Sequence, residues 1–489
     1  MLSYQDVHFR YSGRPLDGVE GLNLNIAAGE VVLLCGRSGC GKTTLTRLAN
    51  GLIPHIYHGD LHGRVTLGGD SVANLATYDI ARQAGSVFQN PRTQFFNPDT
   101  DSEIAFGMEN LAFSADQLLR RMEQTVAQLH LNPLLGRNIH QLSGGEKQRI
   151  AFASVYAMDP ALYVLDEPSA NLDDCAMGTL RRLLRILKAQ GKTILIAEHR
   201  THDILDLVDR VVYLDQGHVA SIYTADEFLR ISGRQRRTMG LRAAKLADIP
   251  LPVPPPRPEN PVLELCEAAV SNGTTPVLQG LSFHASAGEI IAVSGRNGTG
   301  KSSLLRALCG LTDLAGGSVR WQGRTMGARQ RLAHSYMVMQ DVGYQLFAES
   351  VRQECILGIH NPDCPLAERV LQELNLWPYR DAHPNTLSGG QKQRLAVAVA
   401  MVSDKSILLF DEPTSGLDLD SMNQVAQVLR ALAHRGRVIF VATHDYELVC
   451  TACTRVLHFA DGHLAADLPV NRQNADALRR CFFEERSNP

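Results

Sequence analysis

The stretch Gly36-Arg37-Ser38-Gly39-Cys40-Gly41-Lys42-Thr43 decides the fold of this 489-residue chain. An apolar run over residues 30–35 precedes it and is typical of a buried strand, and a helical pattern over residues 44–52 follows it. Between a strand and a helix, such glycines let backbone N–H groups turn inward around a phosphate, and the helix N-terminus adds positive potential. We therefore expect Lys42 to reach the β- and γ-phosphates of a nucleotide and the Thr43 hydroxyl to bind Mg²⁺.

The same motif occurs a second time, as Gly295-Arg296-Asn297-Gly298-Thr299-Gly300-Lys301-Ser302. A second pair of matching stretches lies at residues 142–149 and 387–394, and a third at residues 163–168 and 408–413. The spacing from Ser143 to Asp166 equals that from Ser388 to Asp411. Such regular self-similarity indicates one structural unit written twice, with Lys301 and Ser302 repeating the roles of Lys42 and Thr43.

Composition and charge exclude several classes of protein. Apolar residues make up 44% of the chain and charged residues 20%, which is typical of globular domains rather than disordered chains. A net charge of −3 provides no global field for holding a polyanion. No apolar run approaches the roughly 20 residues that span a bilayer, and the N-terminal residues lack a signal-peptide pattern. Ten scattered cysteines suit a reducing cytosol.

The expected domain organisation follows the repeat. We predict a first domain over residues 1–232, a basic and then proline-rich linker over 233–261, a second domain over 262–470 and a tail over 471–489. The prolines favour an extended tether, and the basic run over 230–247 is expected to be a solvated helix face.

Short apolar runs that alternate with helical patterns predict an α/β fold in each half. Buried parallel strands are expected over residues 30–35, 161–165 and 192–197, and over 289–293, 407–410 and 438–442. Each half ends with an Asp-x-Gly-type turn between short strands, over 212–219 and 456–464, which indicates an antiparallel appendage.

Acidic residues end one apolar strand in each half. Asp166 and Asp411 stand where a magnesium-binding carboxylate is expected beside a phosphate loop. The next residues, Glu167 and Glu412, are candidates to hold and deprotonate an attacking water.

Together these motifs resemble the ABC-type ATPases: two phosphate loops, two Leu-Ser-Gly-Gly signatures, two Asp-Glu pairs and a histidine after each pair. The resemblance implies two tandem P-loop domains, each with a mostly parallel sheet, an antiparallel β appendage and a helical subdomain. It also implies head-to-tail pairing, so that each ATP lies between the phosphate loop of one half and the signature of the other. The first implied site comprises Lys42, Thr43, Gln89, Asp166, Glu167 and His199 with Ser388, Gly389 and Gly390. The second comprises Lys301, Ser302, Gln340, Asp411, Glu412 and His444 with Ser143, Gly144 and Gly145. Mg²⁺ would be held by Thr43, Gln89 and Asp166, and by Ser302, Gln340 and Asp411.

Three positions separate the halves. Tyr11 matches the family's adenine-stacking aromatic, whereas residues 270–273 contain none, so we expect weaker adenine binding at the second site. The first signature ends in Glu146 rather than the commoner glutamine. Arg200 follows the first histidine where the second half has Asp445. No catalytic glutamate or histidine is missing, so both sites are expected to be competent.

The segments 88–95, 103–110 and 50–57, with 339–350 in the second half, resemble the ATPases of energy-coupling-factor (ECF) importers. That resemblance implies an integral membrane scaffold subunit, a substrate-binding membrane subunit, and a location on the cytoplasmic face of the membrane. The cargo would be a vitamin, a vitamin precursor or a transition-metal ion. Two alternatives stay open: a twin-ABC ATPase that acts on ribosomes or nucleic acid, and the ATPase of an exporter.

The remaining signals are weaker. The acidic residues after each Q-loop glutamine are expected to receive arginines from the scaffold; they are Asp99, Asp101, Glu103, Glu109, Asp341, Glu349 and Glu354. The electropositive loop is expected to favour the Cys40 thiolate. An equally good interpretation is that Cys40 is simply a small residue with no chemical role. A metal site at His55, His58 and His62, or at Cys450 and Cys453, is disfavoured against a polar loop and packing cysteines.

Overall fold

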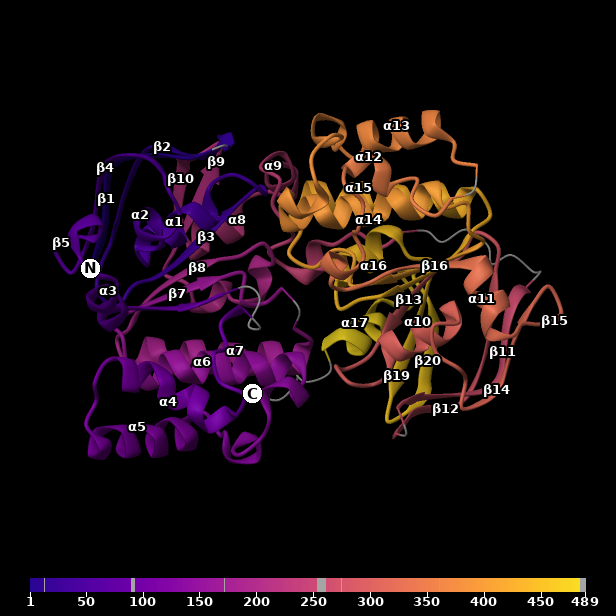
Figure 1. Cartoon of the computed structure of the whole chain (residues 1–489), viewed down its shortest axis with the longest axis horizontal. Coiled ribbons are helices and arrows are strands. Elements are labelled where there is room, and N and C mark those ends of the chain that lie inside the picture. The colour runs from indigo at the N-terminus through magenta and orange to yellow at the C-terminus, as the bar shows by residue number, and fades with distance from the viewer. Residues whose placement is uncertain are drawn as a thin grey trace. The chain divides into compact units, whose positions relative to one another are not determined.

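The computed structural model describes residues 1–12, 14–88, 93–170, 172–252, 261–273, 275–359 and 361–483. The chain divides into two compact units, Met1–Asp248 and Ile249–Pro489, which follow one another along the colour gradient of Figure 1. Each unit contains a mostly parallel sheet, a smaller antiparallel sheet and surrounding helices, which confirms the α/β prediction.

The main sheet of the first unit has the strand order β10-β9-β3-β8-β7-β6. Strands β3, β6, β7, β8 and β9 are parallel, and β10 returns antiparallel to β9. The parallel strands are buried on both faces, as their continuous apolar sequences predict. The strand bounds are β3 Val31–Gly36, β6 Ala84–Val87, β7 Leu162–Asp166, β8 Thr193–Ala197, β9 Arg210–Asp215 and β10 His218–Thr224.

Alternate residues of β3 enter two different cores. Val32 and Leu34 pack with α1 (Lys42–Ala49) and with the antiparallel sheet, whose order is β2-β1-β4-β5. Leu33 and Cys35 face the other way and pack with residues of α6 (Gly144–Met158) and α7 (Asp174–Ala189). This period-two alternation holds the phosphate loop, which follows β3, between two packed layers. The antiparallel strands are β1 Leu2–Tyr11, β2 Arg14–Ile26, β4 Gly59–Leu67 and β5 Asp70–Ser71.

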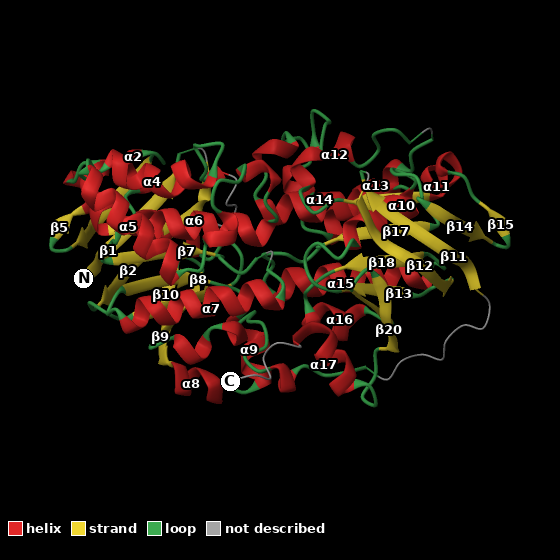
Figure 2. Cartoon of the chain, turned by 90° about the horizontal axis from the view of Figure 1, so that it is seen from below, coloured by secondary structure: helices red, strands yellow, loops and turns green. Residues whose placement is uncertain are grey.

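The other helices of the first unit extend this core, and in Figure 2 helices lie along the strands of each unit. Helix α6 contacts α4 and α5, which together form the predicted helical part of the unit. The bounds are α2 Leu52–His55, α3 Thr77–Gln83, α4 Thr100–Asn110, α5 Ala115–Gln128, α8 Ala225–Arg230 and α9 Gly233–Thr238.

The second unit repeats this plan with the main-sheet order β16-β17-β18-β13-β19-β20 and the antiparallel order β12-β11-β14-β15. Its main-sheet strands are β13 Ile290–Ser294, β16 Ser335–Val338, β17 Ile407–Asp411, β18 Val438–Ala442, β19 Arg455–Ala460 and β20 His463–Pro469. Its antiparallel strands are β11 Pro261–Asn272, β12 Thr275–Ser286, β14 Gly316–Trp321 and β15 Arg324–Thr325. Its helices are α10 Lys301–Cys309, α11 Ala328–His334, α12 Val351–Glu354, α13 Cys364–Glu373, α14 Gly389–Val402, α15 Leu419–His434, α16 Tyr446–Ala452 and α17 Ala475–Phe483.

Part of the segment predicted to be a linker packs into the first unit. Arg236 and Arg242 are buried, at 3% and 2% exposure, so the basic run is not simply a solvated face. Arg236 donates to the Ile231 carbonyl oxygen and forms an ion pair with Asp248 at 3.2 Å. The proline-rich residues 253–260 lie outside the described residues.

The segment predicted to be a C-terminal tail contains a helix, α17. Its Leu478 and Phe482 are buried, and Phe482 packs against Tyr446 of α16 with ring centroids 5.6 Å apart. The amphipathic pattern of this helix therefore joins the second unit instead of extending into solvent.

Candidate functional site

The phosphate loops connect β3 to α1 and β13 to α10, the positions that the sequence predicts. Both helices begin at the motif lysine, slightly earlier than expected, after a glycine in the left-handed region. A Cβ on Gly36 would come within 2.3 Å of the Leu214 carbonyl oxygen, and one on Gly295 within 2.4 Å of the Phe459 carbonyl oxygen. The loops therefore need glycine at these positions, because the neighbouring strand of the sheet, β9 or β19, passes directly beside them.

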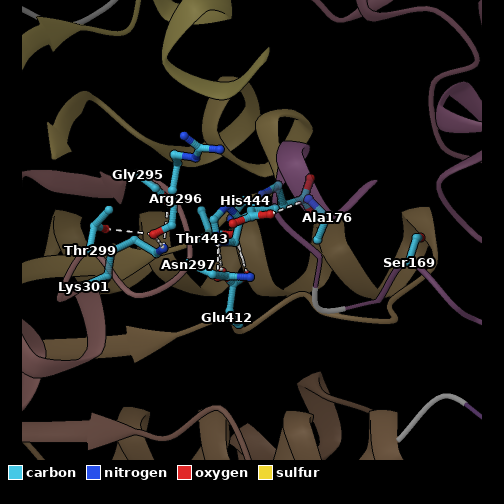
Figure 3. Close-up of polar contacts among 12 residues, drawn as sticks. Ser169, Ala176, Gly295, Arg296, Asn297, Thr299, Lys301, Glu412, Thr443 and His444 are labelled. Atoms are coloured by element: carbon cyan, nitrogen blue, oxygen red, sulfur yellow. Dashed lines mark hydrogen bonds and ion pairs between the residues drawn. The ribbon is translucent and has the colours of Figure 1, made fainter. Parts of the chain in front are cut away.

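The motif lysines reach back over their loops. Lys42 Nζ donates to the carbonyl oxygens of Gly36 and Arg37 at 3.1 and 3.0 Å. Lys301 Nζ does the same to Gly295 and Arg296 at 2.7 and 2.9 Å (Figure 3). Neither helix N-terminus has a side-chain cap, so its first N–H groups fit an anionic ligand such as a phosphate.

A hydroxyl and a buried carboxyl face each other beside each loop. Thr43 Oγ1 lies 3.3 Å from Asp166 Oδ1, and the Ser302 hydroxyl hydrogen-bonds to Asp411 in the second unit. Burial, with a smaller contribution from the neighbouring Glu167 carboxylate, raises the pKa of Asp166 to about 6, while the Thr43 hydroxyl opposes the shift. Burial likewise raises the pKa of Asp411. These oxygen donors fit Mg²⁺, which prefers carboxylate and hydroxyl ligands and whose charge would favour ionised carboxylates.

The candidate water-activating glutamates directly follow these carboxyl groups. Glu167 and Glu412 have φ of 49° and 50°, in the left-handed region that side chains rarely adopt. Glu167 Oε1 lies 3.3 Å from His199 Nε2, and Glu412 Oε1 lies 3.6 Å from His444 Nε2. Figure 3 shows His444 close to Glu412 and to Asn297 of the phosphate loop, and its Nε2 is 3.1 Å from Asn297 Oδ1. The fold therefore brings these predicted residues together within each unit.

The signature serines cap helices, since α6 and α14 begin directly after Ser143 and Ser388. Ser143 Oγ accepts the Glu146 N–H at 3.3 Å, and Glu146 Oε2 accepts the Ser143 N–H at 2.8 Å. Ser388 and Gln391 form the same reciprocal capping box. A Cβ at Gly144 or Gly389 would meet no atom within 4 Å, so the space over each helix N-terminus is open within its unit.

Tyr11 lies beside the first phosphate-loop helix. Its hydroxyl is 3.3 Å from Thr44 Oγ1 and accepts from Arg47 at 3.0 Å, and Arg47 stacks 4.0 Å from the Tyr57 ring. Gln89 lies outside the described residues, and Gln340 follows β16. In the second unit the equivalent strand, β11, ends at Asn272, so an asparagine stands at the strand end where the first unit has Tyr11.

Two of the acidic residues expected to face a membrane partner have another role. Glu103 and Glu354 are buried, at 2% and 3% exposure. Glu103 Oε2 accepts the N–H groups of Phe96 and Asn97, and Glu354 Oε2 accepts those of Phe347 and Ala348, all at 2.7–3.0 Å. The hypothesis that these two glutamates receive arginines is wrong, because their charge is already used to fix the loop.

That same loop presents an aromatic residue in each unit. Phe96 is 74% exposed and Phe347 is 75% exposed, one residue position equivalent to the other. Phe96 stacks on Phe106 of α4 with ring centroids 5.0 Å apart. Sequence reasoning missed Phe96 and Phe347, which we call the apolar tips, because it considered only the charged residues of these segments. The Gln-x-Phe spacing that both halves share was the signal that indicated them.

Cys40 is buried in the core beside the loop, and its Sγ lies 3.9 Å from Lys42 Nζ. We expect a maleimide to label the exposed Cys364 at least about tenfold faster than Cys40, since a buried thiol reacts only when its surroundings open. ATP should slow the labelling of Cys40 further. Peptide mass mapping after timed labelling measures both rates, and equal rates at the two cysteines would contradict this expectation.

The described residues contain no group of three or more His, Cys, Asp or Glu side chains that could hold a metal ion. Cys450 and Cys453 are both buried. Among the described helices, none has the length and apolar character needed to cross a bilayer.

Comparisons with known proteins agree with this geometry. The family model for ABC transporters matches residues 19–170 and 278–415. A protein of Treponema denticola, assigned as an ABC transporter ATP-binding protein, is 45% identical over 480 residues, which are 97% of this chain and 98% of that protein. A protein of Streptomyces coelicolor with the same assignment is 34% identical over 529 residues, covering 96% and 94%.

Solved structures share the fold. The RNase-L inhibitor structure aligns with a TM-score of 0.64 at 22% identity and covers 98% of this chain and 93% of its own. A chain in the complex of archaeal ribosomal stalk protein aP1 with the ribosome recycling factor aABCE1 gives the same TM-score and identity, covering 96% and 91%. At this identity the likeness concerns the fold alone.

Proposed function

Because the chain belongs to the ABC transporter family and is an ATPase of that family, we propose that it is the motor subunit of an ECF-type membrane importer. Its membrane partners are a scaffold subunit and a substrate-binding subunit, and its cargo is a vitamin, a vitamin precursor or a transition-metal ion. The ECF-like segments noted in the sequence support this assignment. The chain then works at the cytoplasmic face of the membrane.

The arrangement of the described residues supports separate roles in binding and hydrolysing ATP. Lys42 and Lys301 hold phosphate oxygens, and the capping-box helices α6 and α14 offer N–H groups to the nucleotide. Thr43 with Asp166, and Ser302 with Asp411, would hold Mg²⁺, whose charge would neutralise phosphate charge during hydrolysis.

Glu167 and Glu412 are placed to orient the attacking water and to take its proton, and the adjacent His199 and His444 fix their direction. Head-to-tail pairing of the two units, which the resemblance implies, stays a prediction.

The observation that carries the importer proposal is the pair of exposed phenylalanines after β6 and β16. In both units a buried glutamate holds the backbone N–H of the phenylalanine while its ring stays exposed, and such exposed apolar surface marks a place where a partner can bind. An apolar contact with helices of a membrane scaffold fits two such tips better than a polyanion does, since a polyanion needs a basic surface.

The test replaces both tips, as Phe96→Asp with Phe347→Asp, in a tagged chain that is purified with its native membrane complex. Burying one phenylalanine contributes about 1.5–3 kcal/mol, so the double variant should bind its membrane subunits roughly 10²-fold more weakly or worse. The ATPase activity of the isolated variant should stay within about twofold of wild type, because the contacts described for the two residues are with Glu103, Phe106 and Glu354 and not with the phosphate loops.

The matched control is Ile222→Asp with Leu332→Asp, which changes exposed apolar residues of β10 and α11. The control should retain the membrane subunits and energised uptake after reconstitution. Wild-type yield of the complex with the phenylalanine variant would overturn the docking role. Capture of ribosomal subunits or nucleic acid in place of integral membrane proteins would overturn the importer proposal.

A further inference from the structure

A buried carboxylate in the first unit connects the two loops that carry Glu167 and His199. Glu198 directly follows β8 and is 3% exposed. Its Oε1 accepts the Ser169 N–H at 2.7 Å and its Oε2 accepts the His199 N–H at 3.1 Å. Ser169 lies two residues after Glu167, so one side chain ties together both loops of the candidate catalytic pair.

Arg200 holds the other side of the same residue. Its guanidinium donates to the Ser169 carbonyl oxygen at 2.5 Å. Ser169 is therefore held through its N–H by Glu198 and through its carbonyl by Arg200. We call these two side chains the Ser169 clamp.

The second unit connects the equivalent loops through different side chains. Thr443 and Asp445 occupy the positions of Glu198 and Arg200, so the acid has moved by two residues. Thr443 Oγ1 donates to Glu412 Oε2 at 3.3 Å, whereas Asp445 Oδ2 accepts from the Thr414 hydroxyl at 2.7 Å. A hydroxyl therefore contacts the candidate catalytic glutamate directly, and Figure 3 shows Thr443 beside Glu412.

We infer that Glu198 is a positioning residue of the first site, which holds the Glu167 and His199 loops through two backbone hydrogen bonds, one to each oxygen of its carboxylate. The inference rests on the role proposed for Glu167. It makes the two sites unequal for a reason separate from adenine binding, because Thr443 cannot lose a charge.

The charges around Glu198 set the pH at which the two sites should begin to differ in turnover. Burial raises the pKa of Glu198 to about 7; the Ser169 N–H opposes the shift, the Glu167 carboxylate adds to it, and Arg200 opposes it. Glu198 also contacts His199, through the backbone N–H that its Oε2 accepts. Below this pH the added proton removes the negative charge and makes one oxygen a donor and a weaker acceptor, so the two N–H bonds weaken and the clamp loosens. First-site turnover should therefore be full above about pH 7 and fall below it.

The experiment measures ATP turnover of the full chain between about pH 5.5 and 8.5 in two backgrounds. Glu412→Gln leaves the first site with its glutamate, and Glu167→Gln leaves the second. The first background should lose up to about tenfold in turnover per pH unit below 7, and the second should lack this step. Each background keeps one glutamate beside its histidine, so the two sites that are compared have the same catalytic pair.

Three clamp variants, each measured in the Glu412→Gln background so that only the first site keeps its glutamate, give a second readout. Glu198→Gln keeps the size but has one acceptor oxygen, so kcat should fall with KM nearly unchanged and the pH step should disappear. Arg200→Asp places a second carboxylate beside the buried one and should lower kcat at least about tenfold. Glu198→Thr with Arg200→Asp installs the arrangement of the second unit and should recover most of the lost kcat, without the pH step.

The possible results separate the two hypotheses. If Glu198→Gln keeps wild-type kcat and pH profile, or if the double variant is only the sum of the single effects, the clamp is overturned. If turnover is normal in Glu167→Gln with Glu412→Gln, the role of Glu167 itself is overturned. A merely structural role of Glu198 would lower stability in all variants alike and would not produce recovery in the swapped pair.

Discussion

Replacing Glu167 and Glu412 together with glutamine is expected to lower ATP turnover by roughly 10²–10⁴-fold and to leave ATP binding nearly intact. Glutamine keeps the shape of each side chain but cannot take a proton from water. The two glutamates lie beside His199 and His444 and directly follow the carboxyl groups assigned to Mg²⁺. Steady-state turnover and a nucleotide-binding titration measure the two effects separately.

The control for this prediction is Glu123→Gln, an exposed residue of α5 outside both sites. It should keep wild-type turnover. The two single substitutions at the catalytic positions should differ from each other, because the Tyr11 aromatic is present in the first unit only. Near-normal hydrolysis in the double variant would remove both glutamates from the mechanism.

The sequence predicted most of the fold because the motifs stand at strand ends. A phosphate loop needs a strand before it and a helix after it, and the Asp-Glu pair needs the end of another parallel strand. Once β3, β7 and β8 are adjacent, Lys42, Asp166 and His199 meet at one edge of the sheet, as the spacing indicated. The exact repetition then placed the second set.

The errors concern polar groups whose state depends on partners distant in the sequence. Arg236 looked solvated, because nothing local reveals that Asp248 would pair with it in a buried position. Glu103 and Glu354 looked like surface charges, although each is buried under backbone N–H groups of a loop. Only one feature of the sequence pointed to Glu198, namely that Thr443 occupies its position in the second half. Burial of a polar side chain is a tertiary property, so composition and periodicity do not report it.

A buried ion pair in the second unit leads to the second large effect. Arg455, at the start of β19, is 2% exposed; its Nε lies 2.6 Å from Asp467 Oδ1, and its NH1 donates to the His284 carbonyl oxygen at 2.7 Å. Glu289 Oε1 lies 3.7 Å from the same guanidinium. Arg455→Met should lower the free energy of unfolding of this unit by about 3–5 kcal/mol, since it leaves Asp467 and Glu289 without their cation.

The first unit contains the matched control, because Arg210 begins β9 and pairs with Glu30 at 2.8 Å in the equivalent place. Ile222 stands where the second unit has Asp467, and the Arg210 side chain is 26% exposed, so water screens the pair. Arg210→Met should therefore cost only about 1 kcal/mol. Urea denaturation followed by hydrogen exchange reports the two units separately, because peptides from each are resolved by mass. Equal losses in the two variants would mean that the Asp467 contact and the deeper burial contribute nothing, and that the buried network does not stabilise the sheet edge beside the second phosphate loop.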